Sequence, residues 1–357
     1  MTRPKHVRDA AVVAMNAGET RYTPTNGTLP LRKAVQAKLA GENQLDYALG
    51  QICIANGAKQ IIFNAFAATL NEGDEVIVPV PYWPTFPDSV RFNGGEPVLL
   101  ACPLEQEYKL QPQQLAQAIS AKARWLVLNN PGNPSGAVYS AAELTALAAV
   151  LRDNPRVWIM LDELYEHILF DGREHVSLLQ VAPDLADRIL LVGGVSKTYA
   201  MTGWRIGFGA GPQALIDAMV VVQSQNSSGA SAISQAAAVA AYQGGLAFLP
   251  AQRAAYQQRR DAIMAQLSLV QGVEVLNPEG AFFIFCRCAG MLGKTRPDGR
   301  LLENEQDVLN YLLESGVSGV AGSAYGLSPY FRLSIAADIE TVREAGRRIA
   351  AACTALK

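Results

Sequence analysis

The stretch Gly193-Gly-Val-Ser-Lys-Thr-Tyr-Ala-Met-Thr-Gly-Trp-Arg-Ile-Gly-Phe-Gly209 directly follows the apolar run 189–192. Such a run is typical of a buried strand, and the glycine pair ends it, which places Lys197 at the strand's carboxyl end. Ligands of α/β sheets bind at that edge, and a lysine among apolar neighbours loses proton affinity and can act as a nucleophile. The competing interpretation of a single Ser-Lys pair is a helix cap or a solvated lysine. Arg205 then opens a second apolar segment.

The bulk composition narrows the class of protein. A chain of 357 residues predicts a large domain with a smaller one, and 50% apolar residues can supply a large core. The net charge of −2 gives no electrostatic reason to expect nucleic acid or an anionic membrane as a partner. Five scattered cysteines predict reduced thiols and a cytoplasmic protein, and three histidines without ligand spacing predict no metal site. No apolar run approaches the ~18 residues of a membrane span.

Short apolar segments alternate with helical ones over the first two thirds of the chain. This alternation predicts an α/β domain with a mainly parallel sheet covered on both faces. The predicted strands are 52–55, 74–79, 96–101, 124–129, 156–161 and 189–192. After residue 213, alanine-rich helices precede a mixed region with apolar runs at 281–286 and 330–335. We therefore expect an N-terminal helix within 1–20 that packs with the smaller domain, a large domain over 21–266 and a smaller α+β domain over 267–357.

Polar residues gather where the predicted strands end. Asn56-Gly-Ala-Lys59 places a glycine turn at a helix start, where free N–H groups suit a phosphate, although many such turns contain glycine. Asn133 lies between two prolines in the turn 130–136. Asp162 ends an apolar strand, where a carboxylate either has a cationic partner or caps the next segment.

Three motifs, taken together with their order and spacing, resemble a known family. They are Asn130-Pro-Gly-Asn-Pro-Ser-Gly136, Asp162-Glu-Leu-Tyr165 and Ser196-Lys-Thr-Tyr-Ala-Met-Thr-Gly-Trp-Arg205. They look like those of the class I/II aminotransferases, which are pyridoxal-phosphate enzymes of fold type I with a seven-stranded sheet. The similarity runs from about His6 to the C-terminus and is greatest to bacterial aspartate aminotransferases.

The resemblance implies roles around the ring of pyridoxal 5'-phosphate. Lys197 matches the lysine that binds the cofactor covalently, and Asp162 matches the carboxylate that keeps the pyridine nitrogen protonated. Asn133 and Tyr165 match donors to the ring hydroxyl oxygen. Trp83 matches the aromatic residue stacked on the ring; core packing is its alternative role. Lys197, Asp162 and Tyr165 are thus the expected catalytic residues.

The resemblance also implies a phosphate site and a dimer. Gly57, Ala58 and Arg205 match the residues that hold the cofactor phosphate, and the neighbouring Lys59 is expected to line the same site. Tyr22 matches a tyrosine that reaches the phosphate of the partner subunit, which implies a homodimer with shared sites.

Substrate residues are the last set that the resemblance implies. Arg332, in Tyr330-Phe-Arg-Leu-Ser334, matches the arginine that binds the substrate α-carboxylate as a fork. Asn133 and Trp83 are expected to border the substrate as well. Lys59 either binds a distal carboxylate or is a solvated lysine, and Tyr325 is expected to line the same pocket.

The implied reaction moves an amino group from an L-amino acid, aspartate-like or aromatic, to a 2-oxo acid such as 2-oxoglutarate. Lys197 would serve as general base, and the kinetics would be ping-pong. The alternatives are a β-lyase or decarboxylase on the same fold, or an N-terminally truncated, weakly active or inactive paralogue. The last is kept because the segment that relatives place before the first helix is not found; Gly194 and Gly132 are smaller departures.

Overall fold

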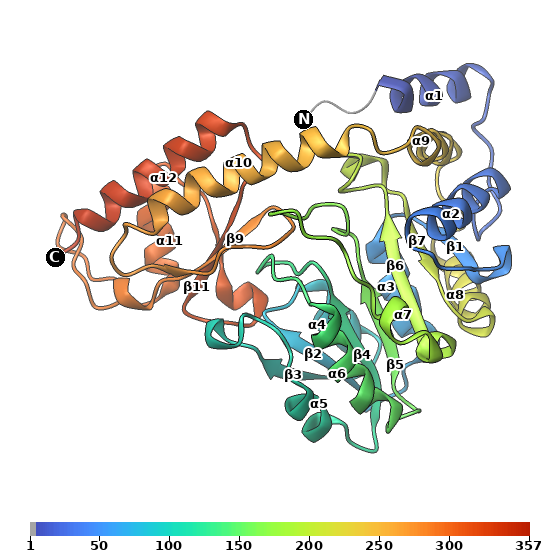
Figure 1. Cartoon of the computed structure of the whole chain (residues 1–357), viewed down its shortest axis with the longest axis horizontal. Helices are drawn as coiled ribbons and strands as arrows, with labels where there is room; N and C mark the ends of the chain where they lie inside the picture. Colours follow the sequence, from blue (N-terminus) through green and yellow to red (C-terminus); the bar gives the residue numbers. More distant parts are fainter. Residues whose placement is uncertain (1–4) are drawn as a thin grey trace.

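The computed structural model describes residues 5–357, and a seven-stranded sheet organises its first two thirds (Figure 1). The strand order is β1-β7-β6-β5-β4-β2-β3, and every neighbouring pair is parallel except the two that involve β7. This confirms the predicted mainly parallel sheet. The strands are β1 (Ile52–Ala55), β2 (Glu75–Val80), β3 (Glu96–Ala101), β4 (Ala123–Asn129), β5 (Trp158–Asp162), β6 (Ile189–Gly194) and β7 (Gly207–Ala210).

The apolar runs form central strands because both faces of this sheet are buried. In β5, Ile159 and Leu161 pack into the core on one face and Met160 into the core on the other. Successive strand side chains point to opposite faces, so a continuous apolar run suits a strand that is covered on both sides. Complete burial of one such side chain contributes about 1.5–3 kcal/mol.

Helices cover the two faces. The core with Met160 includes side chains from α3, α4 and α8, and the opposite core includes side chains from α2, α5, α6, α7 and α9. The helix α6 begins at Ser140, whose side chain accepts from the Glu143 N–H in a capping box. The bounds are α2 (Leu29–Glu42), α3 (Ala58–Thr69), α4 (Thr85–Phe92), α5 (Pro112–Ala118), α6 (Ala141–Arg152), α7 (Leu178–Val181), α8 (Gln213–Asn226) and α9 (Ala232–Gln243).

A four-stranded antiparallel sheet organises the last third, in the order β10-β11-β9-β8. The long helices α10 and α12 lie side by side along it, and α11 packs beside α12 (Figure 1). The strands expected at 281–286 and 330–335 are found at β9 and β11, and the very short β8 was not predicted. The bounds are α10 (Leu249–Leu267), β8 (Glu274–Val275), β9 (Phe283–Arg287), α11 (Glu305–Glu314), β10 (Val320–Ala321), β11 (Tyr330–Ser334) and α12 (Ile339–Thr354).

The first helix, α1 (Lys5–Asn16), does not pack where the sequence placed it. It lies on α9, away from the second sheet (Figure 1), and its Val7 and Ala11 join a core of the large sheet. The expected packing with the smaller domain is wrong, because the apolar stripe of α1 fits the alanine-rich face of α9. Residues 1–4 lie outside the described part of the chain.

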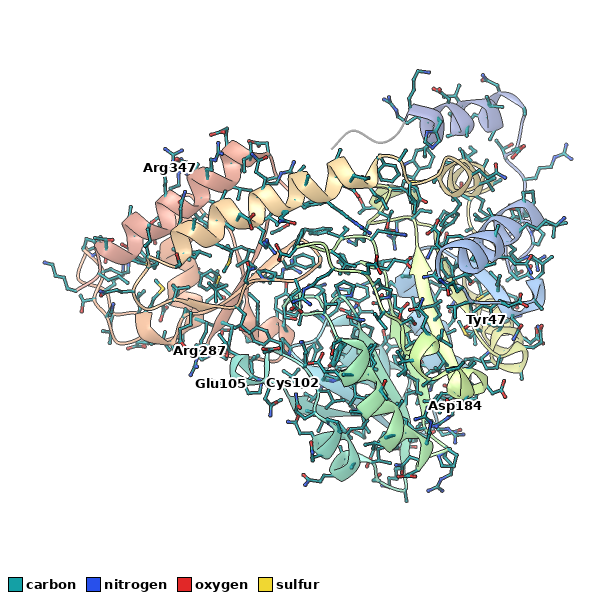
Figure 2. All side chains as sticks on the ribbon, in the orientation of Figure 1. Tyr47, Cys102, Glu105, Asp184, Arg287 and Arg347 are labelled. Carbon is teal, nitrogen blue, oxygen red and sulfur yellow. The ribbon has the colours of Figure 1, made fainter. Side chains whose placement is uncertain are left out.

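We propose that the two sheets are the cores of two domains, residues 21–266 and 267–357. A separate buried cluster that includes Ile284, Leu312 and Leu333 supports this division. The two sheets meet where Arg287 Nη1 of β9 donates to Glu105 Oε1 at 2.9 Å, and both residues are labelled in Figure 2. Among residues 5–357, no helix is both long and apolar enough to cross a membrane.

Candidate active site

A cavity of about 410 Å³ lies at the carboxyl edge of the large sheet, where it faces the second sheet. Because β7 runs opposite to its neighbours, its first residues reach this same edge. The cavity is of the size that holds a small cofactor or ligand. It is lined by Ala58, Lys59, Trp83, Asn129, Asn133, Asp162, Leu164, Tyr165, Ser196, Lys197, Thr202, Arg205, Phe282, Phe283, Arg332 and Ser334.

Lys197 follows β6 and extends into this cavity. Its Nζ lies 5.5 Å from the ring centroids of both Tyr165 and Phe282. Burial lowers the pKa of Lys197; the charge of Asp162 opposes this shift, and Arg332 and Arg205 add to it. A larger fraction of the amine is therefore neutral, and neutral amine is the form that can attack a carbonyl or accept a proton.

Asp162 is the last residue of β5 and is 3% exposed. Burial raises the pKa of its carboxyl to about 7, against the lowering effects of the Leu164 N–H (3.3 Å) and of Lys197. Among residues 5–357, no cationic side chain forms an ion pair with it. The side chain can therefore accept from a cationic N–H group of a ligand.

Asn129 and Asn133 connect this carboxylate strand to the second sheet. Asn129 Nδ2 donates to the carbonyl oxygen of Asp162 at 3.0 Å, and Asn129 Oδ1 accepts from the Asn133 N–H at 2.8 Å. Asn133 Oδ1 accepts from Arg332 Nη1 at 2.9 Å, which leaves the Nδ2 group of Asn133 to donate to a ligand.

Arg332 enters the cavity from β11. Its guanidinium lies 4.3 Å from the ring centroid of Phe283 and 5.0 Å from that of Tyr325. Its Nε is buried without a hydrogen-bond partner, and burial lowers the pKa of the guanidinium against the opposing effects of Tyr325 and Tyr165. A half-buried arginine with an unused donor is suited to a carboxylate ligand.

Tyr325 does not line the cavity as expected. It is 3% exposed and packs in an aromatic cluster with Tyr108, Phe285 and Tyr330. Gly322–Tyr325 form a short 3-10 helix beside β11, and the Tyr325 ring therefore packs against the guanidinium of Arg332.

The turn after β1 forms a cradle. Gly57 has φ +85°, and a Cβ there would overlap the guanidinium of Arg205. That guanidinium donates to the carbonyl oxygens of Asn56 and Thr202, both at 3.1 Å. Ala58 begins α3, so its N–H has no partner within the helix and is available to an anion, as is the positive end of the helix dipole.

Two of the predicted residues are exposed to solvent. Lys59 is exposed, and its Nζ lies 4.8 Å from the ring centroid of Trp83. Tyr22 is 96% exposed and does not line the cavity of its own chain.

Several lining residues were missed at the sequence level. Phe282 and Phe283 close the cavity from the second sheet, and Ser334 lies beside them. Their role depends on how the two sheets face each other, for which the sequence carries no signal. Asn129 could have been found, because it ends an apolar strand just before the predicted turn.

The chain was compared with known proteins. A family model described as aminotransferase class I and II matches residues 2–349. The aspartate aminotransferase of Rhizobium meliloti is 49% identical over 99% of this chain and 86% of its own length. Its crystal structure gives a TM-score of 0.97 at 48% identity, and covers 100% of this chain and 90% of that one.

Two further relatives agree. The aspartate/prephenate aminotransferase of Cereibacter sphaeroides is 46% identical over 99% of this chain and 88% of its own length. The structure of the Thermus thermophilus aspartate aminotransferase with maleate gives a TM-score of 0.91 at 35% identity, over 99% of this chain and 89% of that one.

The fold and the site thus define a pyridoxal-phosphate-dependent enzyme of fold type I. More narrowly, the chain belongs to the class I and II aminotransferase family and is an aminotransferase that uses pyridoxal 5'-phosphate. Neither the site nor these relatives support a lyase or a decarboxylase.

The residues present fit this cofactor. The cradle of Gly57, Ala58 and Arg205 suits a phosphate, and the buried carboxylate of Asp162 suits a protonated ring nitrogen. Lys197, with its lowered pKa, suits a carbonyl carbon. Of these residues, all but Gly57 line the same cavity.

Proposed function

We propose that the cavity binds the cofactor and that Trp83, Asp162 and Lys197 would hold its ring. Lys197 would bind it covalently, Asp162 would pair with the ring nitrogen, and Asn133 and Tyr165 would donate to the ring hydroxyl oxygen. Gly57, Ala58 and Arg205 would hold the phosphate. The support is that all of these except Gly57 line the cavity, and Gly57 adjoins it through Ala58 and Arg205.

We further propose that the amino donor is a dicarboxylic L-amino acid. One observation carries this: Arg332 and Lys59 line the same cavity, and no carboxylate among residues 5–357 pairs with either. Two unpaired cations suit a substrate with a carboxylate at each end. Arg332 would take the α-carboxylate and Lys59 the distal one.

The names of the relatives give the substrate class more detail. They are named for aspartate or for aspartate and prephenate, which are compounds with two carboxylates. We propose aspartate as a donor and a 2-oxo acid such as 2-oxoglutarate as the acceptor. An aromatic donor is compatible with the apolar wall of Trp83, Phe282 and Phe283.

The residues of this chain would then act as follows. When bound, pyridoxal 5'-phosphate supplies the electron sink for removal of the Cα proton. Arg332 and Lys59 would orient the substrate. Lys197 Nζ, freed when the substrate amine takes its place on the cofactor, would accept the Cα proton and donate it at the cofactor carbon. Asp162, held by β5, keeps a positive charge at the ring nitrogen. Phe282 and Phe283 help to exclude water. Because one cavity serves donor and acceptor in turn, we expect ping-pong kinetics.

Replacement of Lys59 tests the substrate proposal. We expect Lys59→Ala to raise KM for aspartate and 2-oxoglutarate by about tenfold or more, since a charge-assisted contact contributes roughly 1.5–3 kcal/mol, and to leave KM for phenylalanine nearly unchanged. Lys59→Arg is the matched control that keeps the charge. An equal rise for all substrates would contradict a contact with the distal carboxylate.

We also propose a homodimer in which Tyr22 reaches the phosphate cradle of the partner. Support comes from a second cavity of about 570 Å³ on the outer side of Arg205 and Lys59, lined also by Phe63 and Phe92. Phe92 is 79% exposed, and Val12 and Val13 of α1 are exposed too.

A cytoplasmic location is proposed as well. It is supported by the five cysteines, which are all unpaired and buried, as expected of a protein from a reducing compartment.

A further inference from the structure

A group of charged and polar side chains lies outside the cavity, next to the segments that carry Asp162 and Lys197. We call it the polar cluster. Its members come from α2 and its C-terminal end, from the segment after β5, and from the residue after Lys197. They are Lys38, Glu42, Asn43, Glu163, Glu166, His167, His175 and Thr198. None of them lines the cavity.

Glu166 anchors the cluster. Its Oε1 accepts from Lys38 Nζ at 2.5 Å, and its Oε2 accepts from Asn43 Nδ2 at 2.8 Å. Burial opposes its ionisation, but Lys38 and the two histidines hold the pKa of Glu166 down to about 2. It is therefore ionised at neutral pH and fixes the segment after β5 to the end of α2.

His167 makes the connection to the lysine segment. Its Nε2 lies 3.1 Å from Glu42 Oε2, and its Nδ1 lies 3.1 Å from Thr198 Oγ1. An ionised carboxylate can only accept, so Nε2 carries a proton, and Nδ1 pairs with the Thr198 hydroxyl. Thr198 is 2% exposed and directly follows Lys197; His167 is the second residue after Tyr165.

Two consecutive residues of α10 hold the same two segments by their backbones. Arg253 Nε donates to the carbonyl oxygen of His167 at 2.7 Å, and Gln252 Nε2 donates to the carbonyl oxygen of Thr198 at 3.0 Å. The helix α10 thus holds the backbone on both sides of the side-chain contact between His167 and Thr198.

We propose that His167 is a positioning residue, which fixes Lys197 relative to the Asp162–Tyr165 turn through its contact with Thr198. This inference rests on the proposed role of Lys197. The physical reason is that proton transfer requires the reacting atoms to be held in place, and a misplacement of ~1 Å can cost about 100-fold in rate. Lys197 lies in the turn that follows β6, outside any helix or strand, so a side-chain contact of the adjacent Thr198 can help to fix its position.

The test removes the contact from either side. Thr198→Val replaces only the hydroxyl by a methyl group, and His167→Phe keeps the ring volume. We expect each to lower kcat by about tenfold with KM changed less than twofold, and to shift the pH midpoint of the bound cofactor's visible absorbance. Thr198→Ser, which restores a hydroxyl, should return both quantities towards the wild-type values.

The double variant separates positioning from general destabilisation. If both residues act through one contact, Thr198→Val combined with His167→Phe should have no larger effect on kcat than one alone. Tyr311→Phe is the stability control, because it removes a buried hydrogen bond (to Ala352 O, 2.9 Å) far from the site. It should lower the melting temperature and leave the absorbance midpoint unchanged.

The outcomes are distinct. If Thr198→Val leaves kcat and the absorbance midpoint at wild-type values, or if the two effects multiply, the positioning role is overturned. If His167→Phe does not fold, the comparison of Thr198→Val with Thr198→Ser decides. A wild-type protein without transaminase activity or cofactor absorbance would instead count against the proposed function.

Discussion

The buried carboxyl group of Asp162 lowers the stability of the folded protein at neutral pH when no ligand pairs with it. Its carboxyl group is buried, lacks a cationic partner among residues 5–357, and has its pKa raised to about 7. The pKa in the folded state is thus higher than the ordinary value of about 3.9 in the unfolded chain. The stability that the protonated carboxyl group contributes to the folded state is therefore fully present below about pH 4 and is lost as the pH rises towards 7.

The cofactor-free protein should therefore gain stability from Asp162→Asn. We expect an increase of roughly 2–4 kcal/mol in the free energy of unfolding at pH 8, and almost none at pH 4. The measurement is chemical unfolding of the apoprotein at both pH values.

Asp187→Asn, at an exposed aspartate, is the matched control and should change neither value by more than about 0.5 kcal/mol. The same Asp162→Asn change should weaken cofactor binding, so that apoprotein and holoprotein respond in opposite directions. A stabilisation that does not depend on pH would contradict the buried carboxylate as its source.

At the scale of single residues, the motifs predicted most of the cavity. Lys197, Asp162 and Asn133 lie at or just after strand ends that hydrophobicity reveals, and Arg205 lies just before a strand. Their combination carries the family resemblance. Phe282 and Tyr325 could not be placed in the same way. Whether an aromatic residue of the second sheet lines the cavity or supports a neighbour depends on the packing between sheets, which has no local signature.

At the scale of elements, the phosphate cradle depends on the close approach of β7 to the start of α3. Gly207 is the first residue of β7, and a Cβ there would overlap the backbone of Gly57 and Ala58. The backbone atoms involved cannot rotate away as a side chain could, so a larger residue must separate the two elements.

We accordingly expect Gly207→Ala to lower the affinity for pyridoxal phosphate by about tenfold or more, since overpacking costs typically ~1–3 kcal/mol. The dissociation constant can be measured from the cofactor's absorbance or fluorescence. In Gly41→Ala the added methyl group meets open space on α2, and this control should be neutral or slightly stabilising. Unchanged affinity in Gly207→Ala would show that the elements need not meet so closely.

The bounds of elements with a clear apolar pattern were predicted well from the sequence. The strands β1 and β3 match the predicted ranges. The two-residue strands β8 and β10 are too short to show a period. The position of α1 was wrong because an apolar helical stripe specifies that a face is buried, and not which surface covers it.

At the scale of the whole molecule, the exposed Tyr22 and the open cavity beside Arg205 predict that two chains share their sites. Sedimentation should give twice the chain mass of 38.3 kDa. Lys197→Ala should be inactive alone. Tyr22→Ala should be largely inactive at low cofactor concentration, because it loses a donor to the phosphate.

Mixing these two variants after subunit exchange should raise the activity above that of Tyr22→Ala alone. In a mixed dimer, the chain with an intact Lys197 receives an intact Tyr22 from its partner, which restores one site. A mixture of Lys197→Ala with Arg332→Ala should show no such gain, since both residues line the cavity of one chain. If the activity of the first mixture is only the diluted activity of Tyr22→Ala, shared sites would be contradicted.

The helix α10 links the segment of Lys197 to the second sheet. Its first turn holds the carbonyls of His167 and Thr198, and its later residues Ile263 and Leu267 belong to the core of the second sheet. Its 19 residues extend for about 28 Å, at ~1.5 Å per residue. If α10 tilts about its first turn, the displacement of its residues is smallest beside Lys197 and grows with distance along the helix. Were the second sheet to swing on this helix, Lys197 would stay almost still.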